Sequence, residues 1–321
     1  MTKKDFTPLD RSKIKTYSIS DRKSKVSLDT MAKPPRPNMM LKDFFDGLPD
    51  VLAAGEIKEV IESVAKSVRN DKPVIAAMGA HVIKVGLSPL IIDLMERKIL
   101  SLVAVNGAGI IHDFELAYAG YTSENVDSSI DDGTFGMAKE TGEMLNNAIK
   151  KGADRGVGLG KAVGDMIEGE RLPNREISIL ASGARLNIPV TVHVAIGTDI
   201  IHMHPSAAGD DIGKTSMKDF LTFASAISNL SGGVYFNIGS TVIMPEVFLK
   251  AISLARNLRS DVRDFMTVDM DFTRHYRPQT NVVKRPTSLG GSGISLVGHH
   301  EIMLPLLFSG VVEALFSEKE R

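Results

Sequence analysis

Short apolar runs alternate with helical patterns along most of the chain, and this alternation constrains the fold more than any other sequence feature. The runs typical of buried parallel strands cover residues 73–78, 100–105, 189–195, 233–238 and 265–269. Segments with helical spacing separate them, among them 56–68, 88–97, 177–186, 218–230 and 245–256. Strand–helix–strand units cross over right-handedly and build parallel sheets. We therefore expect a doubly wound, mostly parallel, Rossmann-like α/β fold.

Two segments stand outside the alternation. Residues 1–40 hold ten Lys or Arg against four Asp or Glu, so this arm carries +6 and the remaining residues carry −7 of the net charge of −1. We expect a basic N-terminal arm over 1–40 that is partly disordered or crosses onto an acidic neighbouring subunit. A single α/β domain over 41–321 follows it, in which the polar helical stretch 133–172 reads as an insertion at one edge of the sheet.

The composition excludes several classes of function. The chain has no cysteine, so disulfides, thiolate metal sites and cysteine nucleophiles are ruled out. The balanced charge argues against a nucleic-acid partner, whose phosphates need neutralising. No apolar run is long enough to span a membrane, and the N-terminus lacks the apolar core of a secretory signal. We expect a cytoplasmic protein with no membrane partner.

Histidines gather where the predicted strands end, which is the edge at which ligands bind in an open parallel sheet. Seven of the eight follow a predicted strand: His81, His112, His193, His202, His204, His299 and His300. Histidine titrates near neutrality and is scarce, so this crowding indicates a site. Structural roles, as helix caps or surface residues, are the alternative for the set.

These positions give a set of candidate catalytic and substrate-binding residues. We assign catalytic roles to His112 and Asp113 as an acid/base pair, and to His202 and His299. Substrate binding falls to Asp199, His204 and Lys84. His202, His204 and Asp199 could also hold a divalent metal, although their spacing matches no known metal signature.

Glycine-rich loops supply the candidate cofactor contacts. Asn106, Gly107 and Gly109 lie between a predicted strand and a helix, a place suited to a cofactor phosphate, and Gly239 follows another strand. The stretch 156–161 resembles a phosphate loop but follows a helix and lacks the required Ser or Thr, so we interpret it as a helix–helix turn. The stretch 289–293 is either a flexible linker or a site loop.

Four segments, in this order and spacing, resemble the deoxyhypusine synthase family and together span most of residues 70–316. They are 86–91 with the loop 106–109, then 187–190, then 236–239, and last 298–299 with 304–307. The resemblance implies a Rossmann-like fold, NAD as cofactor, and tetramers with active sites at subunit interfaces, each covered by a neighbour's N-terminal arm. It also implies transfer of the aminobutyl group of spermidine through a lysine imine.

The chain departs from that family at its catalytic positions. The family's lysine nucleophile is replaced by His299, which cannot form an imine. Ile111 and His112 stand where the family has adjacent acids, and the family's cofactor loop is replaced by 271–275. We therefore expect a related enzyme with transferase-type or NAD-linked chemistry on a small amine-bearing or polar metabolite, and not ordinary deoxyhypusine synthesis. A metal-dependent hydrolase or lyase, and a catalytically inactive oligomeric binding protein, are the alternatives.

Overall fold

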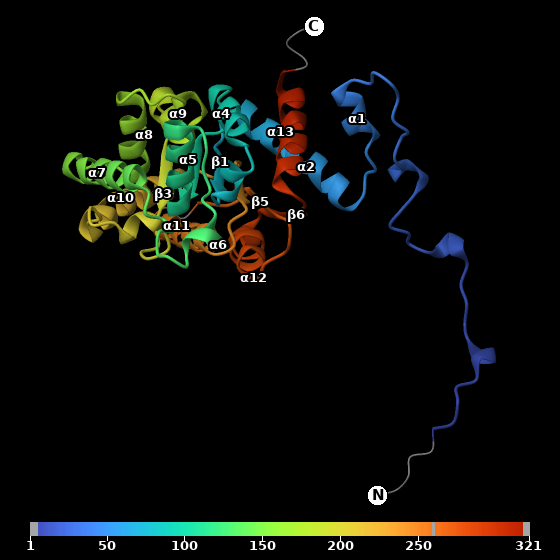
Figure 1. Ribbon diagram of the computed structural model, residues 1–321. Coiled ribbons are helices and arrows are strands. Elements are labelled where there is room, and N and C mark those ends of the chain that lie inside the picture. Colours follow the sequence, from blue (N-terminus) through green and yellow to red (C-terminus); the bar gives the residue numbers. More distant parts are fainter. Residues whose placement is uncertain (1–5, 259–260, 317–321) are drawn as a thin grey trace, which may run out of the picture.

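The computed structural model describes residues 6–258 and 261–316, and a six-stranded sheet forms its centre (Figure 1). The strands are β1 (Val74–Met78), β2 (Leu102–Asn106), β3 (Val190–His193), β4 (Val234–Ile238), β5 (Met266–Asp271) and β6 (Ser292–Val297). Their order is β3-β2-β1-β4-β5-β6, and every neighbouring pair is parallel. The order reverses between β1 and β4, which confirms the doubly wound, Rossmann-like fold expected from the alternation.

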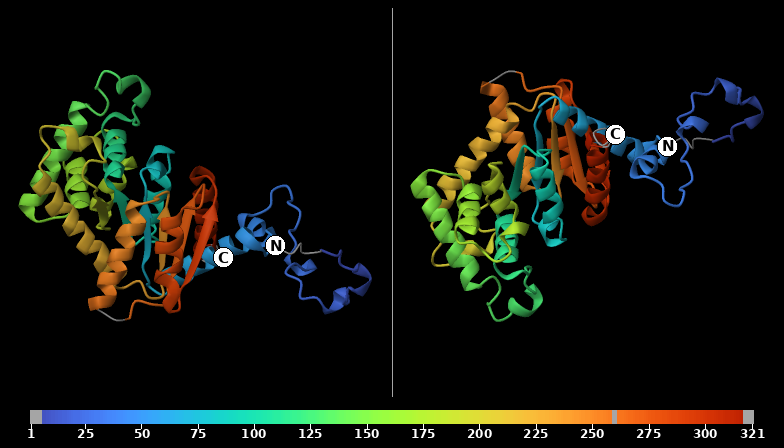
Figure 2. Two further views of the ribbon diagram at one scale, coloured as in Figure 1. Left: turned by 90° about the horizontal axis from the view of Figure 1, so that it is seen from below. Right: turned by 90° about the horizontal axis from the view of Figure 1, so that it is seen from above.

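Helices cover both faces of the sheet (Figure 2). One face packs against α2 (Leu52–Arg69), α4 (Ser88–Glu96), α5 (Gly107–Ala119), α9 (Ile179–Leu186) and α13 (His300–Phe316). The other face packs against α10 (Gly209–Ile227), α11 (Ile243–Leu258) and the π-helical η6 (Gln279–Lys284). Because alternate side chains of a strand point to opposite faces, β1, β2 and β4 contribute to both apolar cores.

The polar middle of the chain forms α6 (Val126–Ser129), α7 (Lys139–Arg155) and α8 (Leu159–Gly169), and α8 packs beside edge strand β3. Gly156 ends α7 with a φ of +69°, so the glycine-rich stretch 156–161 is the helix–helix turn that we expected. The remaining short helices are α1 (Leu41–Gly47), α3 (His81–Lys84), α12 (Tyr276–Pro278), η4 (Arg175–Ile177), η5 (Ile200–Met203) and η7 (Pro286–Leu289).

The structure differs from the sequence prediction at three elements. Strand β6 was not predicted; it begins at the end of the glycine-rich stretch 289–293 and continues to Val297. Only its Ile294 and Leu296 are buried, so it lacks a continuous apolar run. Helix α5 begins at Gly107, directly after β2, so most of the predicted loop 106–109 belongs to its first turn. Helix α10 begins at Gly209, nine residues before the predicted start, because its first two turns are polar.

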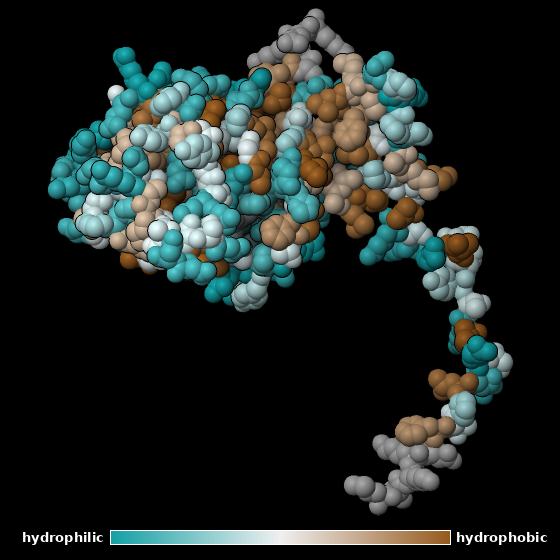
Figure 3. Space-filling view, in the orientation of Figure 1, coloured by the Kyte–Doolittle hydropathy of each residue, from teal (hydrophilic) through white to brown (hydrophobic). Residues whose placement is uncertain are grey.

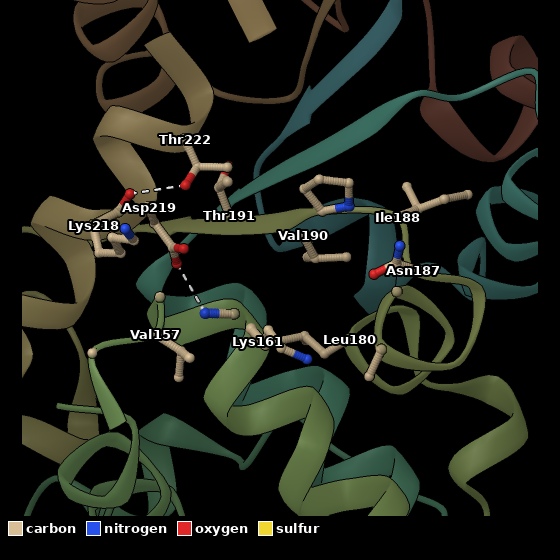
Figure 4. A pocket seen from close by; sticks show the side chains of 16 residues that line it. Val157, Lys161, Leu180, Asn187, Ile188, Val190, Thr191, Lys218, Asp219 and Thr222 are labelled. Atoms are coloured by element: carbon tan, nitrogen blue, oxygen red, sulfur yellow. Dashed lines mark hydrogen bonds between the residues drawn. The ribbon is translucent and has the colours of Figure 1, made fainter. Parts of the chain in front are cut away.

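The free edge of β3 is closed by side chains of α10. The Asp219 carboxylate accepts the backbone N–H of Val192 at 2.9 Å, and the Ser216 hydroxyl donates to the Val192 carbonyl at 2.9 Å. The same carboxylate accepts the N–H of Gly160 in the first turn of α8, also at 2.9 Å (Figure 4). An unpaired strand edge is a site for unwanted pairing, so these contacts both satisfy the edge and hold α8, α10 and β3 together.

The basic arm extends away from the body (Figure 1), and nearly all of its described side chains are exposed. It forms three short 3₁₀ turns, η1 (Arg11–Lys13), η2 (Ile19–Asp21) and η3 (Leu28–Thr30). Backbone hydrogen bonds from Lys33 to Gly47 and from Asp50 to Thr30 tie its end to α1. Residues 1–5 of the predicted arm lie outside the described residues. Within the described part, every helix is too short or too polar to cross a membrane.

Candidate functional site

All eight histidines lie at or beyond the carboxyl ends of the strands. His81 begins α3 after β1, His112 lies in α5 after β2, His193 ends β3, His202 and His204 follow β3, His275 follows β5, and His299 and His300 follow β6. Parallel strands end at the same edge of their sheet. The fold therefore brings these side chains to one edge, and their contacts divide them into groups.

His112 belongs to a chain of hydrogen bonds on the exposed side of α5. Its Nδ1 lies 2.7 Å from the Thr122 hydroxyl oxygen, and that hydroxyl donates to Glu115 Oε2 at 2.5 Å. The second carboxylate oxygen of Glu115 accepts from the Thr141 hydroxyl at 3.1 Å. Burial, and then the nearby positive charge of Lys84, lower the pKa of His112 to about 4. The imidazole is therefore neutral at pH 7, as a general base must be.

Asp113 does not pair with His112, and this corrects the predicted acid/base pair. Successive residues of a helix do not face each other, and the Asp113 side chain lies on the buried face of α5. Its carboxylate accepts from the Ser178 hydroxyl at 2.5 Å and from the N–H groups of Ile179 and Leu180 at 2.8 and 3.3 Å. Burial raises its pKa to about 6 although these hydrogen bonds oppose the shift. Asp113 therefore caps the N-terminus of α9.

Asp199 and His202 form a second group at the start of α5. Their side chains are 4% and 7% exposed, and His202 Nε2 lies 3.9 Å from Asp199 Oδ2. His202 Nδ1 accepts the N–H of Gly197 at 3.1 Å and that of Asp199 at 3.4 Å. This acceptor role places the ring proton on Nε2, toward the carboxylate. Burial lowers the pKa of His202 and raises the pKa of Asp199 to about 6, so neither shift favours a charged pair.

Three side-chain atoms of this group are buried and have no hydrogen-bond partner: Asn106 Oδ1, Asp199 Oδ2 and His202 Nε2. Asn106 ends β2, and the Asp199 carboxylate lies against the Cα of the next residue, Gly107. Buried polar atoms are rarely left unpaired in folded proteins. The carboxyl ends of β2 and β3 therefore present two acceptors and one donor that can bind a ligand.

His204 points away from this group, so the predicted ligand set of His202, His204 and Asp199 does not converge. The ring of His204 packs against Gly142 of α7, and its Nε2 lies 2.9 Å from the Gly136 carbonyl oxygen. Among residues 6–258 and 261–316, the His, Asp and Glu side chains form no group of three or more placed to hold a metal ion. His204 instead fastens the 120–138 segment to the body.

The predicted cofactor glycines have different surroundings. Gly107 faces the Asp199 carboxylate, so a phosphate could reach this helix N-terminus only if Asp199 moved or were protonated. Gly109 lets α5 pack closely on Val105 of β2. Gly239, with a φ of +59°, ends β4 beneath the ring of His300.

The reversal of strand order is lined by His81 and His300, whose ring centroids are 5.7 Å apart. His300 is 2% exposed; its Nε2 lies 3.1 Å from the Met270 carbonyl oxygen, and its Nδ1 is buried without a partner. His299, the predicted catalytic residue beside it, is exposed and stacks on Phe272 with ring centroids 6.4 Å apart. Of His299 and His300, only His300 packs against the strand ends near the reversal of strand order.

The sequence analysis did not identify Glu115 or Thr122 as site residues. It named Asn106 as a cofactor contact but not as a hydrogen-bond acceptor. Glu115 follows His112 by three residues, so the two share a helix face, and this spacing was an available signal. Thr122 lies beyond the end of α5 and is brought back by a turn at Gly120, whose φ is +81°. No local sequence pattern predicts that Thr122 lies beside His112.

A cavity of about 240 Å³ lies near the opposite, amino end of β3, between α8, α9 and α10 (Figure 4). Lys161, Leu180, Asn187, Val190, Asp219 and Thr222 are among its lining residues. The histidine groups are at the other end of this strand, so the cavity is separate from them.

Comparisons with known proteins show the fold of this chain but not its family. No family model matches the sequence, and no curated protein matches it. Among solved structures, a "conserved putative LOR/SDH protein" from Methanococcus maripaludis S2 is 16% identical, with a TM-score of 0.50 over 90% of this chain and 74% of that chain. AgrE, solved as a ternary complex with ornithine and NAD+, is 13% identical, with a TM-score of 0.54 over 84% of this chain.

This chain covers 34% of AgrE, so it spans about a third of that protein's length. A "putative deoxyhypusine synthase" from Entamoeba histolytica is 12% identical, with a TM-score of 0.49 over 85% of this chain and 93% of that chain. At these identities, the likeness to the first two structures shows a shared fold.

Proposed function

We propose that this chain is an enzyme of NAD-linked chemistry that acts on a small amine-bearing metabolite at the carboxyl ends of β2 and β3. The observation that carries the proposal is the group of unpartnered buried atoms there: Asn106 Oδ1, Asp199 Oδ2 and His202 Nε2. Leaving a buried polar group unpaired costs about 1–3 kcal/mol. A ligand that supplied the partners would recover that free energy.

The chemistry of these atoms defines the class of substrate. Two acceptor oxygens, one of them on a carboxylate, fit the N–H groups of an ammonium ion. The Nε2–H of His202 fits an acceptor such as a carboxylate or hydroxyl oxygen. A small molecule with an amine beside an oxygen acceptor would satisfy all three. AgrE, about a third of which matches this chain, was solved with ornithine, an amine-bearing metabolite, and with NAD+.

The cofactor would bind where the strand order reverses, the usual position of a dinucleotide in this fold. Gly79 and Gly239 end the two strands that flank the reversal. Asn106 ends β2, the strand whose end contacts the ribose in that fold. Its unpartnered Oδ1 has two lone pairs, so it can accept from a ribose hydroxyl as well as from the substrate amine. Asn106 and Gly239 are therefore the members of the predicted cofactor set that fit NAD, while Gly107 faces the carboxylate of Asp199.

When bound, NAD+ supplies a hydride acceptor, and the side chains of this chain do the remaining work. Asp199 and Asn106 accept hydrogen bonds from the substrate amine and orient its carbon. With NAD+ bound as the hydride acceptor, the neutral His112 would accept the proton that the substrate ammonium gives up. Loss of one proton and one hydride from the primary ammonium leaves an iminium ion, with the proton held on His112. Lys84, beside His112, favours return of the neutral imidazole. His299 is exposed and takes no part in this step.

Replacing His112 by glutamine is expected to lower NAD+-dependent turnover strongly. The probes are ornithine, lysine and putrescine, and the measurement is NADH absorbance together with calorimetric titration of NAD+. General-base removal typically costs about 10²- to 10⁴-fold in rate, so kcat/KM should fall within that range while NAD+ affinity stays unchanged. Lys150→Gln, an exposed change on α7, is the matched control and should keep full activity. Failure of the wild type to bind NAD+ would overturn the NAD-linked proposal.

We also propose that the protein works as a homo-oligomer, in keeping with the tetramer implied by the family resemblance. Helix α13 is apolar on nearly all sides and only part of it is buried, an arrangement typical of a helix that packs on both sides. Apolar side chains gather over α13 and α1 in Figure 3. The +6 arm is complementary in charge to the −7 body of a second copy.

Light scattering after size exclusion tests this oligomer. The full chain is expected at a multiple of 34.7 kDa, and removal of residues 1–40 is expected to weaken the assembly because it removes the complementary charge. A strictly monomeric full chain across micromolar concentrations would contradict the proposal.

A further inference from the structure

We propose that Glu115, acting through Thr122, is a positioning residue that holds His112 in one tautomer, with the proton on Nδ1 and the lone pair on Nε2. The inference rests on the proposed function, in which His112 is the base. It adds what the proposed function leaves open, namely which nitrogen of the ring does the work and what fixes that choice.

The direction of the hydrogen bonds carries the argument. The Thr122 hydroxyl has one proton, and it donates that proton to Glu115 Oε2 at 2.5 Å. The hydroxyl oxygen can then only accept from its other neighbour, His112 Nδ1, at 2.7 Å. Nδ1 must therefore carry a proton. In a neutral imidazole the other nitrogen, Nε2, then holds the free lone pair.

The Glu115 carboxylate is itself held in place from a second side. Its Oε1 accepts from the Thr141 hydroxyl at 3.1 Å, and Thr141 lies in the first turn of α7. Glu115 is half-buried, so its hydrogen bonds are partly shielded from water. A carboxylate has no proton to give, so it can only draw the hydroxyl proton toward itself. The order of donors is thereby fixed from Glu115 outward to the imidazole.

Other charged groups do not supply an alternative orienting partner. Asp113, the neighbouring carboxylate, has its hydrogen bonds committed to the start of α9. Lys84 is the cation whose charge acts on His112, and a lysine cannot accept a proton from a ring nitrogen. Among the described residues, the imidazole of His112 has one hydrogen bond, the one to Thr122.

The test is the tautomer itself, read from nitrogen chemical shifts of ¹⁵N-histidine-labelled full-length protein at pH 7.5, with the His112 signal assigned by its loss in His112→Gln. The wild type is expected to show Nδ1 protonated and Nε2 unprotonated. Thr122→Val removes the acceptor, so most of the population should shift to the Nε2–H form that an unconstrained histidine prefers. Thr122→Ser keeps the hydroxyl and should keep the wild-type tautomer.

Two further variants separate positioning from simple packing. Glu115→Ala frees the Thr122 hydroxyl to donate to Nδ1, so it should shift the tautomer as Thr122→Val does. Thr141→Val removes only the outer hydrogen bond and should leave the tautomer unchanged. A wild-type His112 with its proton on Nε2 would overturn the inference without any variant, as would a Thr122→Val protein whose tautomer matches the wild type.

The outcome for the proposed function is read separately. If the tautomer responds as described but His112→Gln leaves NAD+ reduction intact, the positioning stands and the catalytic role of His112 falls. If turnover depends on His112 but the tautomer ignores Thr122 and Glu115, the reverse holds. With the role intact, Thr122→Val is expected to lower kcat/KM about 10- to 100-fold, as loss of an orienting partner does.

Discussion

Replacing Asp219 by alanine is expected to lower the free energy of unfolding by about 4 kcal/mol. The buried carboxylate accepts backbone N–H groups from Gly160 and Val192 at 2.9 Å each, and from Leu159. Without it, three donors at the start of α8 and the edge of β3 lose their partner. Each unsatisfied buried donor costs about 1–3 kcal/mol, which gives the expected total.

Urea unfolding followed by circular dichroism at pH 8 measures this loss. The pH matters because burial raises the pKa of Asp219 to about 7, so the group is mostly ionised at pH 8. Asp210→Ala, in the exposed first turn of the same helix, is the control and should cost no more than about 1 kcal/mol. A loss below about 1 kcal/mol for Asp219→Ala would mean that the edge of β3 does not depend on this side chain.

Replacing Gly79 by alanine is expected to destabilise the protein by about 3 kcal/mol. A Cβ at this position would overlap the carbonyl oxygen of Gly239, at the point where β1 and β4 end side by side. Backbone cannot rotate away as a flexible side chain can, so the strands would have to separate, and such overpacking typically costs about 1–3 kcal/mol or more.

The matched control for Gly79 is another glycine whose surroundings are open. A Cβ at Gly213, in α10, meets nothing within 4 Å. Gly213→Ala should therefore stabilise the protein by about 0.5–1 kcal/mol, the usual gain from replacing a helical glycine. The unfolding midpoints of the two variants should move in opposite directions. An unchanged midpoint for Gly79→Ala would show that the strand ends at the reversal can part freely.

Most of the fold could be predicted from the sequence, and the failures have local causes. The five predicted strands all form, because each is a short apolar run that is buried on both faces. Strand β6 was missed because this edge strand contains Gly293 and buries only two of its side chains. The start of α10 was misplaced because its first turns are mostly polar, and Ile212 is the one apolar side chain that they bury.

The candidate site could be located but not assembled from the sequence. Counting polar residues after each predicted strand brings the histidines to the correct edge, since that edge follows from strand direction. The predicted pairing of His112 with Asp113 was wrong because successive residues of a helix point in different directions. His112 to Glu115 was readable from helical spacing, whereas the Thr122 link depended on the turn after α5.

The sequence by itself determined the layered α/β architecture and the edge at which the chemistry would gather. Apolar periodicity sets both, because burial of alternating elements leaves few arrangements. Only the tertiary structure decided what each polar side chain does. Asp113 finds Ser178 across 65 positions of sequence, and His204 finds Gly136 across 68. A hydrogen bond requires its atoms within about 3 Å, and that proximity is set by the packing of segments far apart in the chain.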